Sequence, residues 1–294
     1  MTLLVLALLL QPASEDSVFK LFDQVAHPYL KYQDLKEPSK EGLVGMGAEA
    51  ARVLVQRMRT ENAREHHALV DILSEIGEEA IPYLIETLED TCGRAQRLAV
   101  HILGKIGSEE PVSEILEFLD DTLWKNRSAA VEALGGIAWP STLGAIVETR
   151  DDPVEIVRKE VAHALSFFRG EEACATLFRL LNDPFYSVRY TAFASLVERE
   201  ELPISCVLDA LKGSSGFKRA LCLRLLIRHK GHPLPKSILL AELESPNWRL
   251  RAEAAVILKD FELSFSDRQG IAFLRAREES ALVLLGLDEL LGDP

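Results

Sequence analysis

Four polar side chains recur at nearly equal spacing in the first half of the chain, and their chemistry could be used together. They are Asp71, His101, Glu132 and His163, which are 30, 31 and 31 residues apart. Carboxylate and imidazole groups held side by side would raise the histidine pKa values and make this surface sensitive to pH. The same residue types are also metal ligands. We call these four residues the acid–histidine stripe.

The spacing disfavours a metal site. If each residue of the stripe lies on its own helix, neighbouring helices are about 8–10 Å apart, whereas metal ligands must lie about 2 Å from one ion. The alternatives that remain are a stripe that binds a partner and an ordinary solvated stripe. We therefore predict no metal and no cofactor.

The elements that must position the stripe are pairs of amphipathic helices. The segment from Gly77 to Gly107 reads GEEAIPYLIETLEDTCGRAQRLAVHILGKIG. Its first half has apolar residues three and four apart, at Ile81, Leu84, Ile85 and Leu88, and its second half repeats this at Ala99, Val100, Leu103 and Ile106. Because each helix is apolar on one side only, the pair must bury its faces against each other and against neighbouring pairs.

The pattern repeats along the chain with a period of 30–32 residues. Three columns keep this register. The first is a turn aspartate: Asp90, Asp121, Asp152 and Asp183. The second is a polar residue six positions later: Gln96, Arg127, Arg158, Arg189, Arg219 and Arg251. The third is a leucine: Leu73, Leu103, Leu134, Leu165, Leu196, Leu226 and Leu258.

These motifs resemble those of a known repeat family. Asp-Pro-x-x-x-Val-Arg occurs at 152–158 and 183–189, with a weaker copy at 245–251, and Leu-Gly-x-Ile-Gly occurs at 103–107. Together they resemble the short HEAT-like repeats of prokaryotes, the type also found in phycobilisome lyases, over residues 47–262. The resemblance implies a structural ladder in which the turn aspartate and the following arginine are hydrogen-bonded between neighbouring repeats. Its members would be Asp121, Asp152, Asp183, Arg127, Arg158 and Arg189.

We therefore predict an all-α fold, a right-handed α-α superhelix of about seven helix pairs with degenerate capping repeats. The predicted organisation is a signal peptide at 1–14, an N-terminal cap at 15–46, HEAT-like repeats at 47–262 and C-terminal capping helices at 263–294. Within the N-terminal cap, Pro38 is expected to interrupt the second helix.

The resemblance also predicts where a partner would bind. In such solenoids the second helix of each pair usually lines the concave side, and the acid–histidine stripe falls on the solvent side of those helices. The same face continues towards the C-terminus with aromatic and basic residues: Phe167, Tyr190, Arg224 and Arg228. An alternative is that Phe167 or Phe168 fills a gap between repeats. An acidic end opposite a cationic end favours a protein or peptide as the partner.

The net charge and the N-terminal sequence limit the kind of ligand and the cellular compartment that we expect. The formal net charge of −13 argues against nucleic-acid binding, which depends on clustered lysine and arginine. The apolar run 3–10 is too short to span a bilayer but fits the apolar core of a signal peptide. We expect a periplasmic or secreted protein without an integral membrane segment in the mature chain. The alternatives are a cytoplasmic protein with an apolar capping helix and a misassigned start.

The cysteines do not indicate a compartment. The chain has four of them and no Cys-x-x-Cys motif, so neither a zinc knuckle nor a redox pair is predicted. We expect free thiols, with Cys174 and Cys206 as the pair that could bridge two repeats.

No enzyme signature is present. A di-iron hydroxylase of the deoxyhypusine type would need His-Glu motifs, which are missing, and a HEAT-like DNA glycosylase would need a basic groove. A bilin lyase is harder to exclude, because its repeats look like these. We therefore expect a non-catalytic protein-interaction scaffold. The alternative is a lyase-like or accessory enzyme component that handles a cofactor.

Overall fold

A computed structural model describes most of the chain and divides it into two compact units. The described residues are 14–28, 33–199, 202–212, 218–219, 221–223, 225 and 236–292. The units are Met1–Phe168 and Arg169–Pro294, called here the first and the second unit. The predicted signal peptide lies outside the described residues except for Ser14, which caps the first described helix by accepting a hydrogen bond from the backbone N–H of Ser17.

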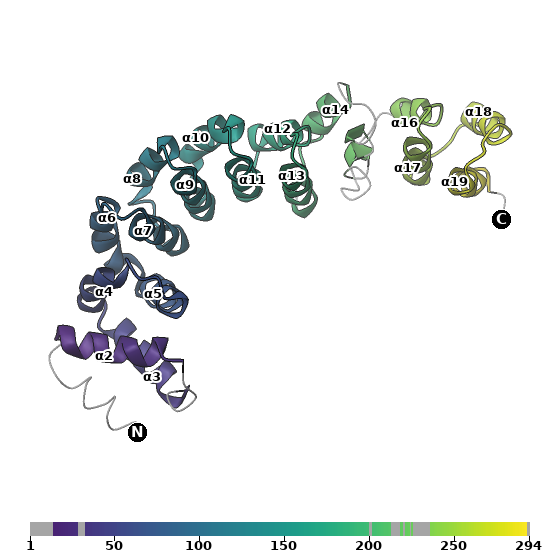
Figure 1. Ribbon diagram of the computed structural model, residues 1–294. Helices are drawn as coiled ribbons and strands as arrows, with labels where there is room; N and C mark the ends of the chain where they lie inside the picture. The colour runs from purple at the N-terminus through teal and green to yellow at the C-terminus, as the bar shows by residue number, and fades with distance from the viewer. Residues whose placement is uncertain are drawn as a thin grey trace. The chain divides into compact units, whose positions relative to one another are not determined.

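The first unit is a series of helices, several of which are extended by a short 3-10 turn (Figure 1). Its elements are α2 (Glu15–Ala26), α3 (Gln33–Gly45), α4 (Ala48–Leu54), η2 (Val55–Arg57), α5 (Ala63–Ile76), η3 (Gly77–Ala80), α6 (Ile81–Leu88), α7 (Gly93–Ile106), α8 (Val112–Glu117), η4 (Phe118–Asp120), α9 (Trp124–Ile137), η5 (Pro140–Thr142), α10 (Leu143–Glu148), η6 (Thr149–Asp151), α11 (Glu155–Ala164) and η7 (Leu165–Phe167). The first helices of the pairs are α4, α6, α8 and α10, and the second helices are α5, α7, α9 and α11.

The second unit has the same kind of elements. They are α12 (Glu171–Leu180), α13 (Tyr186–Glu198), α14 (Ile204–Lys212), α16 (Lys236–Glu242), α17 (Trp248–Leu258), α18 (Phe265–Arg275) and α19 (Ala281–Leu291). The described part of the chain contains no strand, and the fold is the predicted all-α solenoid of helix pairs. None of the described helices is both long and apolar enough to span a bilayer.

The second helices α7 and α9 bury an apolar face, and each ends at a residue with a positive φ. In α7 the buried side chains include Leu98, Ile102 and Leu103, which recur at helical spacing. Gly107 ends this helix with a φ of 76°, in the left-handed region that glycine adopts without strain. Ala138 takes the equivalent place after α9 with a φ of 51°.

Small residues let consecutive second helices approach closely. A Cβ atom placed on Gly104 of α7 would lie 2.5 Å from the Cα atom of Ala133 in α9. A Cβ atom on Gly135 of α9 would lie 2.6 Å from the Cβ atom of Ala164 in α11. The backbones are therefore in contact along the row α7, α9, α11, and this packing leaves no room for a larger side chain.

One detail differs from the expectation. The prediction that Pro38 interrupts a helix is wrong, because α3 runs from Gln33 to Gly45 with Pro38 inside it. Asp34, whose carbonyl would have accepted the missing hydrogen bond, is exposed, so water can replace the N–H.

Replacing Gly104 tests the close approach. We expect Gly104→Ala to lower the free energy of unfolding by about 1–3 kcal/mol, because the added methyl group must push α7 and α9 apart. Urea denaturation followed by circular dichroism measures the loss. The matched control is Gly144→Ala in α10, where an added Cβ meets nothing within 4 Å and stability should stay equal or rise. Equal losses in both variants would contradict the packing argument.

Candidate functional site

The four residues of the acid–histidine stripe lie on four consecutive second helices. Asp71 is on α5, His101 on α7, Glu132 on α9 and His163 on α11. These helices pack in that order, α5 on α7, α7 on α9 and α9 on α11. Glu132 and His163 are exposed, and Asp71 and His101 are half-buried. The stripe therefore has one residue on each of four neighbouring helices, and all four side chains are at least partly accessible to solvent.

The centre of the stripe is an imidazole–carboxylate contact between two helices. His101 Nδ1 lies 3.4 Å from Glu132 Oε1. The hydrogen bond from His101 is the main reason why the pKa of Glu132 lies below its usual value, although partial burial acts against it. Lys105, and the imidazoles of His101 and His163 when they are protonated, act in the same direction as the hydrogen bond. The carboxylate of Glu132 thus lies among basic side chains.

Asp71 makes a different contact. Its Oδ2 atom lies 3.4 Å from Nε2 of His67, one turn away on the same helix. Lys40 reaches from α3 to Glu75 of α5 at 2.8 Å. The pKa of Lys40 is raised mainly by its hydrogen bond to Glu75, and the charge of Asp71 contributes. Neither His67 nor Lys40 was predicted from the sequence, although the spacing of four between His67 and Asp71 is a signal for such a pair.

The other end of the stripe is aromatic. The rings of His163 and Phe167 meet edge to face, with centroids 5.3 Å apart and an angle of 84° between their planes. Phe167 is 52% exposed, whereas Phe168 is 5% exposed. Of the two phenylalanines, Phe168 is therefore the one that packs into the fold, and Phe167 is exposed to solvent.

The remaining predicted binding residues belong to the second unit. Tyr190 on α13 is exposed and stacks on Tyr186, with ring centroids 6.0 Å apart. The guanidinium of Arg189 lies 5.9 Å from the centroid of the Tyr186 ring. Arg224 and Arg228 lie outside the described residues. Within the part of the chain that is described, no three His, Cys, Asp or Glu side chains are grouped so that they could hold a metal ion.

The ladder residues link one turn to the next. Arg127 donates two hydrogen bonds to the carboxylate of Asp152, at 2.6 and 3.0 Å, and a third to the carbonyl of Asp121 at 2.8 Å. Arg158 donates to the carbonyl of Asp152 at 2.7 Å. Arg189 makes the same bond to the carbonyl of Asp183, also at 2.7 Å. Each arginine thus holds the turn of its own repeat, and Arg127 also binds the next one.

The turn aspartates have a second role, because each also binds the backbone of its own turn. Asp121 accepts a hydrogen bond from the N–H of Leu123, Asp152 from Val154 and Asp183 from Phe185, at 2.6–2.8 Å. Burial pushes the pKa of Asp152 up, but its hydrogen bonds from Arg127 and Val154 and the nearby arginine charges outweigh burial and leave the pKa lowered.

Where the arginine column is interrupted, other residues make the link. Arg59 donates two hydrogen bonds to Asp90, at 3.0 and 2.8 Å, although it lies outside the predicted column. Arg97 donates to Asn126, and Asn126 in turn donates to Asp121. The repeat pattern does not predict these links, because Arg59, Arg97 and Asn126 lie outside the repeated columns.

In the second unit, glutamates outside the predicted aspartate column take the acidic role. Arg251 donates to both carboxylate oxygens of Glu278, at 2.6 and 2.7 Å, and to the carbonyl of Ser245. Arg219 donates to Oε1 of Glu242 and to the carbonyl of Leu211. The hydrogen bonds from Arg251 are the main reason why the pKa of Glu278 is lowered.

The four cysteines are free thiols. Cys206 donates from Sγ to the carbonyl of Glu171, 3.4 Å away. Burial raises the pKa of Cys174, and it raises that of Cys222 to about 11, so these thiols are protonated at neutral pH.

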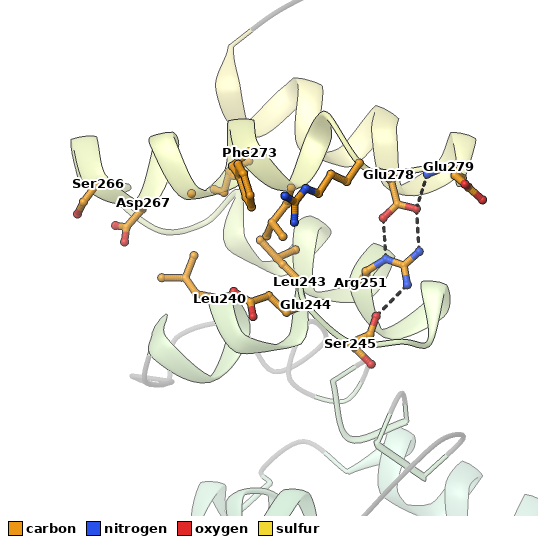
Figure 2. Close-up of a pocket in the computed structure, with 14 residues that line it drawn as sticks. Leu240, Leu243, Glu244, Ser245, Arg251, Ser266, Asp267, Phe273, Glu278 and Glu279 are labelled. Carbon is orange, nitrogen blue, oxygen red and sulfur yellow. Dashed lines mark hydrogen bonds and ion pairs between the residues drawn. The ribbon is translucent and has the colours of Figure 1, made fainter.

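A cavity of about 660 Å³ lies in the second unit, outside the predicted stripe. It is bounded by α16, the turn after it and α18, and by the turn that follows α18 (Figure 2). No motif in the sequence indicated it.

Asp152→Asn tests the ladder, because the amide can still accept from the Val154 N–H but loses the charge that Arg127 binds. We expect the free energy of unfolding at neutral pH to fall by about 2–4 kcal/mol. The contribution of Asp152 is complete above the pKa of an unfolded aspartate, about 4, and is lost as the pH falls through the lower folded pKa. Wild type should therefore lose stability more steeply than the variant below pH 4.

Glu61→Gln is the control for that experiment. Glu61 pairs with Arg94 at 2.9 Å but its side chain is 84% exposed, so the same chemical change should leave stability almost unchanged. Denaturant unfolding between pH 3 and 7 gives both comparisons. Equal changes in the free energy of unfolding for the two substitutions would show that the Arg127–Asp152 pair stabilises the fold no more than an exposed ion pair does.

Solved structures with a similar arrangement of helices come from several kinds of protein. One is an engineered protein, 17% identical, with 98% of this chain and 97% of that chain covered and a TM-score of 0.45. Another is human deoxyhypusine hydroxylase in complex with glycerol, 20% identical, with 83% and 96% covered and a TM-score of 0.35. A third is the complex of CpcE and CpcF of phycocyanin lyase from Nostoc sp. PCC7120, 17% identical, with 82% and 94% covered and a TM-score of 0.41.

The family comparison is more specific. A comparison with curated proteins found no match. A family model described as HEAT repeats matches residues 51–124 and 112–197, which together span half of the 294 residues. The matched region contains the row α5, α7, α9 and α11, the arginine column from Arg127 to Arg189 and the whole acid–histidine stripe. With its repeated helix pairs and its linked turns, the chain belongs to the HEAT-repeat family.

Proposed function

We propose that this protein is a non-catalytic scaffold that binds a protein or peptide along the second-helix face of its first unit. One observation carries the proposal. The contact between His101 and Glu132 joins two helices at 3.4 Å, yet both side chains remain accessible, with 32% and 50% of their surface exposed. Exposed pairs of this kind contribute little to stability, so the fold itself does not require these residues.

The side chains on this second-helix face would fit a partner that has polar groups and one apolar side chain. Glu132 and Asp71 offer carboxylates, His101 and His163 offer imidazoles, and Phe167 offers an exposed ring beside His163. Aromatic residues are enriched where binding energy is concentrated, and charged neighbours set the orientation of a partner. The turn residues, in contrast, are already engaged in the ladder, whereas the stripe residues are not part of it.

Capture of a partner by matched variants tests the proposal. The stripe variant carries Asp71→Ala, His101→Ala, Glu132→Ala and His163→Ala. The control variant removes two carboxylates and two neutral polar groups from exposed positions on the first-helix side: Gln56→Ala, Glu86→Ala, Ser113→Ala and Glu148→Ala. A partner captured from native extract should bind the stripe variant at least about tenfold more weakly and the control as well as wild type.

The alternative outcomes decide against the proposal. Equal binding by the two variants, both shown by circular dichroism to be folded, would move the binding surface away from the stripe. A purified protein with bound cofactor and visible absorbance would instead support the lyase-like or accessory component.

We also propose that the protein is periplasmic or secreted. The support is the apolar run 3–10, followed by Gln11, Pro12 and Ala13. Mass spectrometry of the protein from its native source should find an N-terminus near residue 15. A peptide that retains residues 1–10 in the mature protein would contradict the proposal.

A further inference from the structure

The cavity in the second unit has two facing walls built by different repeats. Figure 2 shows Phe273 of α18 on one side, and Leu240 and Glu244, which belong to α16 and the turn after it, on the other. Its volume of about 660 Å³ is within the range of sites that bind small molecules or peptide side chains. The opening is broad enough that all the residues just named remain at least partly exposed.

The floor of the cavity is apolar. Leu243 is 3% exposed and Ile271 is 1% exposed, and both line the cavity while they pack into the fold. Phe273, in contrast, is 56% exposed. An exposed phenylalanine beside an apolar floor gives a seat for an apolar side chain, whose burial there is favourable because it removes both surfaces from water.

Some of the charged groups that line the cavity are already neutralised. Arg251 holds Glu278 through two hydrogen bonds, which Figure 2 shows at one end of the cavity. Asp267 accepts a hydrogen bond from Lys236 Nζ at 2.7 Å. Arg251, Glu278 and Asp267 line the cavity, but each charge is already paired with an opposite charge and therefore attracts a ligand only weakly.

Two charged groups are different. The guanidinium of Arg277 lies 4.0 Å from the centroid of the Phe273 ring, and it forms no ion pair with any described residue. Glu244, on the other wall, likewise has no ion pair within the described ranges. The carboxylate of Glu279 also lines the cavity, but Figure 2 shows it beyond Glu278, with its side chain directed away from Phe273. Among the described residues, Arg277 and Glu244 are thus the unpaired charges on the two walls beside the apolar floor, and Glu279 adds an unpaired carboxylate at the edge of the cavity.

From this arrangement we propose that the cavity binds an extended peptide segment of a partner protein. The segment carries an apolar side chain flanked by an acidic residue, which binds Arg277, and by a basic residue, which binds Glu244. Arginine recognises carboxylates through paired hydrogen bonds, and stacking on Phe273 orders the guanidinium before the peptide arrives. This surface is independent of the acid–histidine stripe, since every residue that forms it belongs to the second unit.

A blocked cavity gives the first test. Gly270 lines the cavity on α18, and a Cβ atom added there meets nothing within 4 Å. Gly270→Leu therefore adds a bulky side chain at the wall of the cavity, with a Cβ atom that meets nothing within 4 Å, and it replaces a helical glycine by a better helix former. Gly144→Leu in α10 is the matched control, because that glycine also has open space around it.

The probe is a library of random twelve-residue peptides displayed on phage, selected against the full chain. We expect the enriched peptides to share an acidic, an apolar and a basic residue. They should bind Gly270→Leu at least about tenfold more weakly than wild type and bind Gly144→Leu equally well. Thermal unfolding of both variants verifies that they are folded.

Charge exchange gives the second test. In the double variant Glu244→Arg and Arg277→Glu, the two free charges change places, so the enriched peptides should carry their acidic and basic residues in the opposite order. Failure to enrich any peptide, or peptides that bind Gly270→Leu as tightly as wild type, would overturn the proposal. Self-association of wild type that Gly270→Leu abolishes would overturn it as well, because the occupant would then be a second copy of this chain.

Discussion

The close approach of consecutive second helices in the first unit is the constraint on which the repeat depends. Gly104 faces Ala133, and Gly135 faces Ala164, with so little space that a single methyl group on either glycine would meet the neighbouring helix. Backbones in such contact must keep the same relative position from one repeat to the next. This explains why the period stays within 30–32 residues through the arginine and leucine columns, because an insertion inside a helix would rotate its small residues away from the contact.

The turns solve a second problem, which is how to hold the ends of short helices. Arginine suits this task because one guanidinium can bind a carbonyl of its own turn and a carboxylate of the next turn at once, as Arg127 does. The geometry matters more than the position in the sequence. Arg59 supplies the same link to Asp90 from a different place, and Glu278 replaces an aspartate opposite Arg251.

Two surfaces carry side chains that take part neither in the close packing of the helices nor in the hydrogen bonds between turns. On the second helices of the first unit lies the acid–histidine stripe, where His101 contacts Glu132 across two helices. In the second unit, the first helices α16 and α18 leave a cavity with Arg277 and Glu244 on its two walls. The two surfaces differ in chemistry, since one is polar with an aromatic end and the other has an apolar floor with charges at its sides.

The sequence by itself determined the helix pairs, their period, the residues that face the core and the identity of the second helices. It could do so because helical periodicity and the turn motif are local, and because a repeat shows the same signal several times. It also named Arg127 and Asp152, which the fold joins. Only the tertiary structure decided that Asp71 contacts His67, that Phe168 rather than Phe167 is buried, that Pro38 remains inside α3, and that α16 and α18 enclose a cavity. Each of these depends on the distance and angle between helices, or on which turn of a helix faces its neighbour. Spacing along the chain does not contain that information.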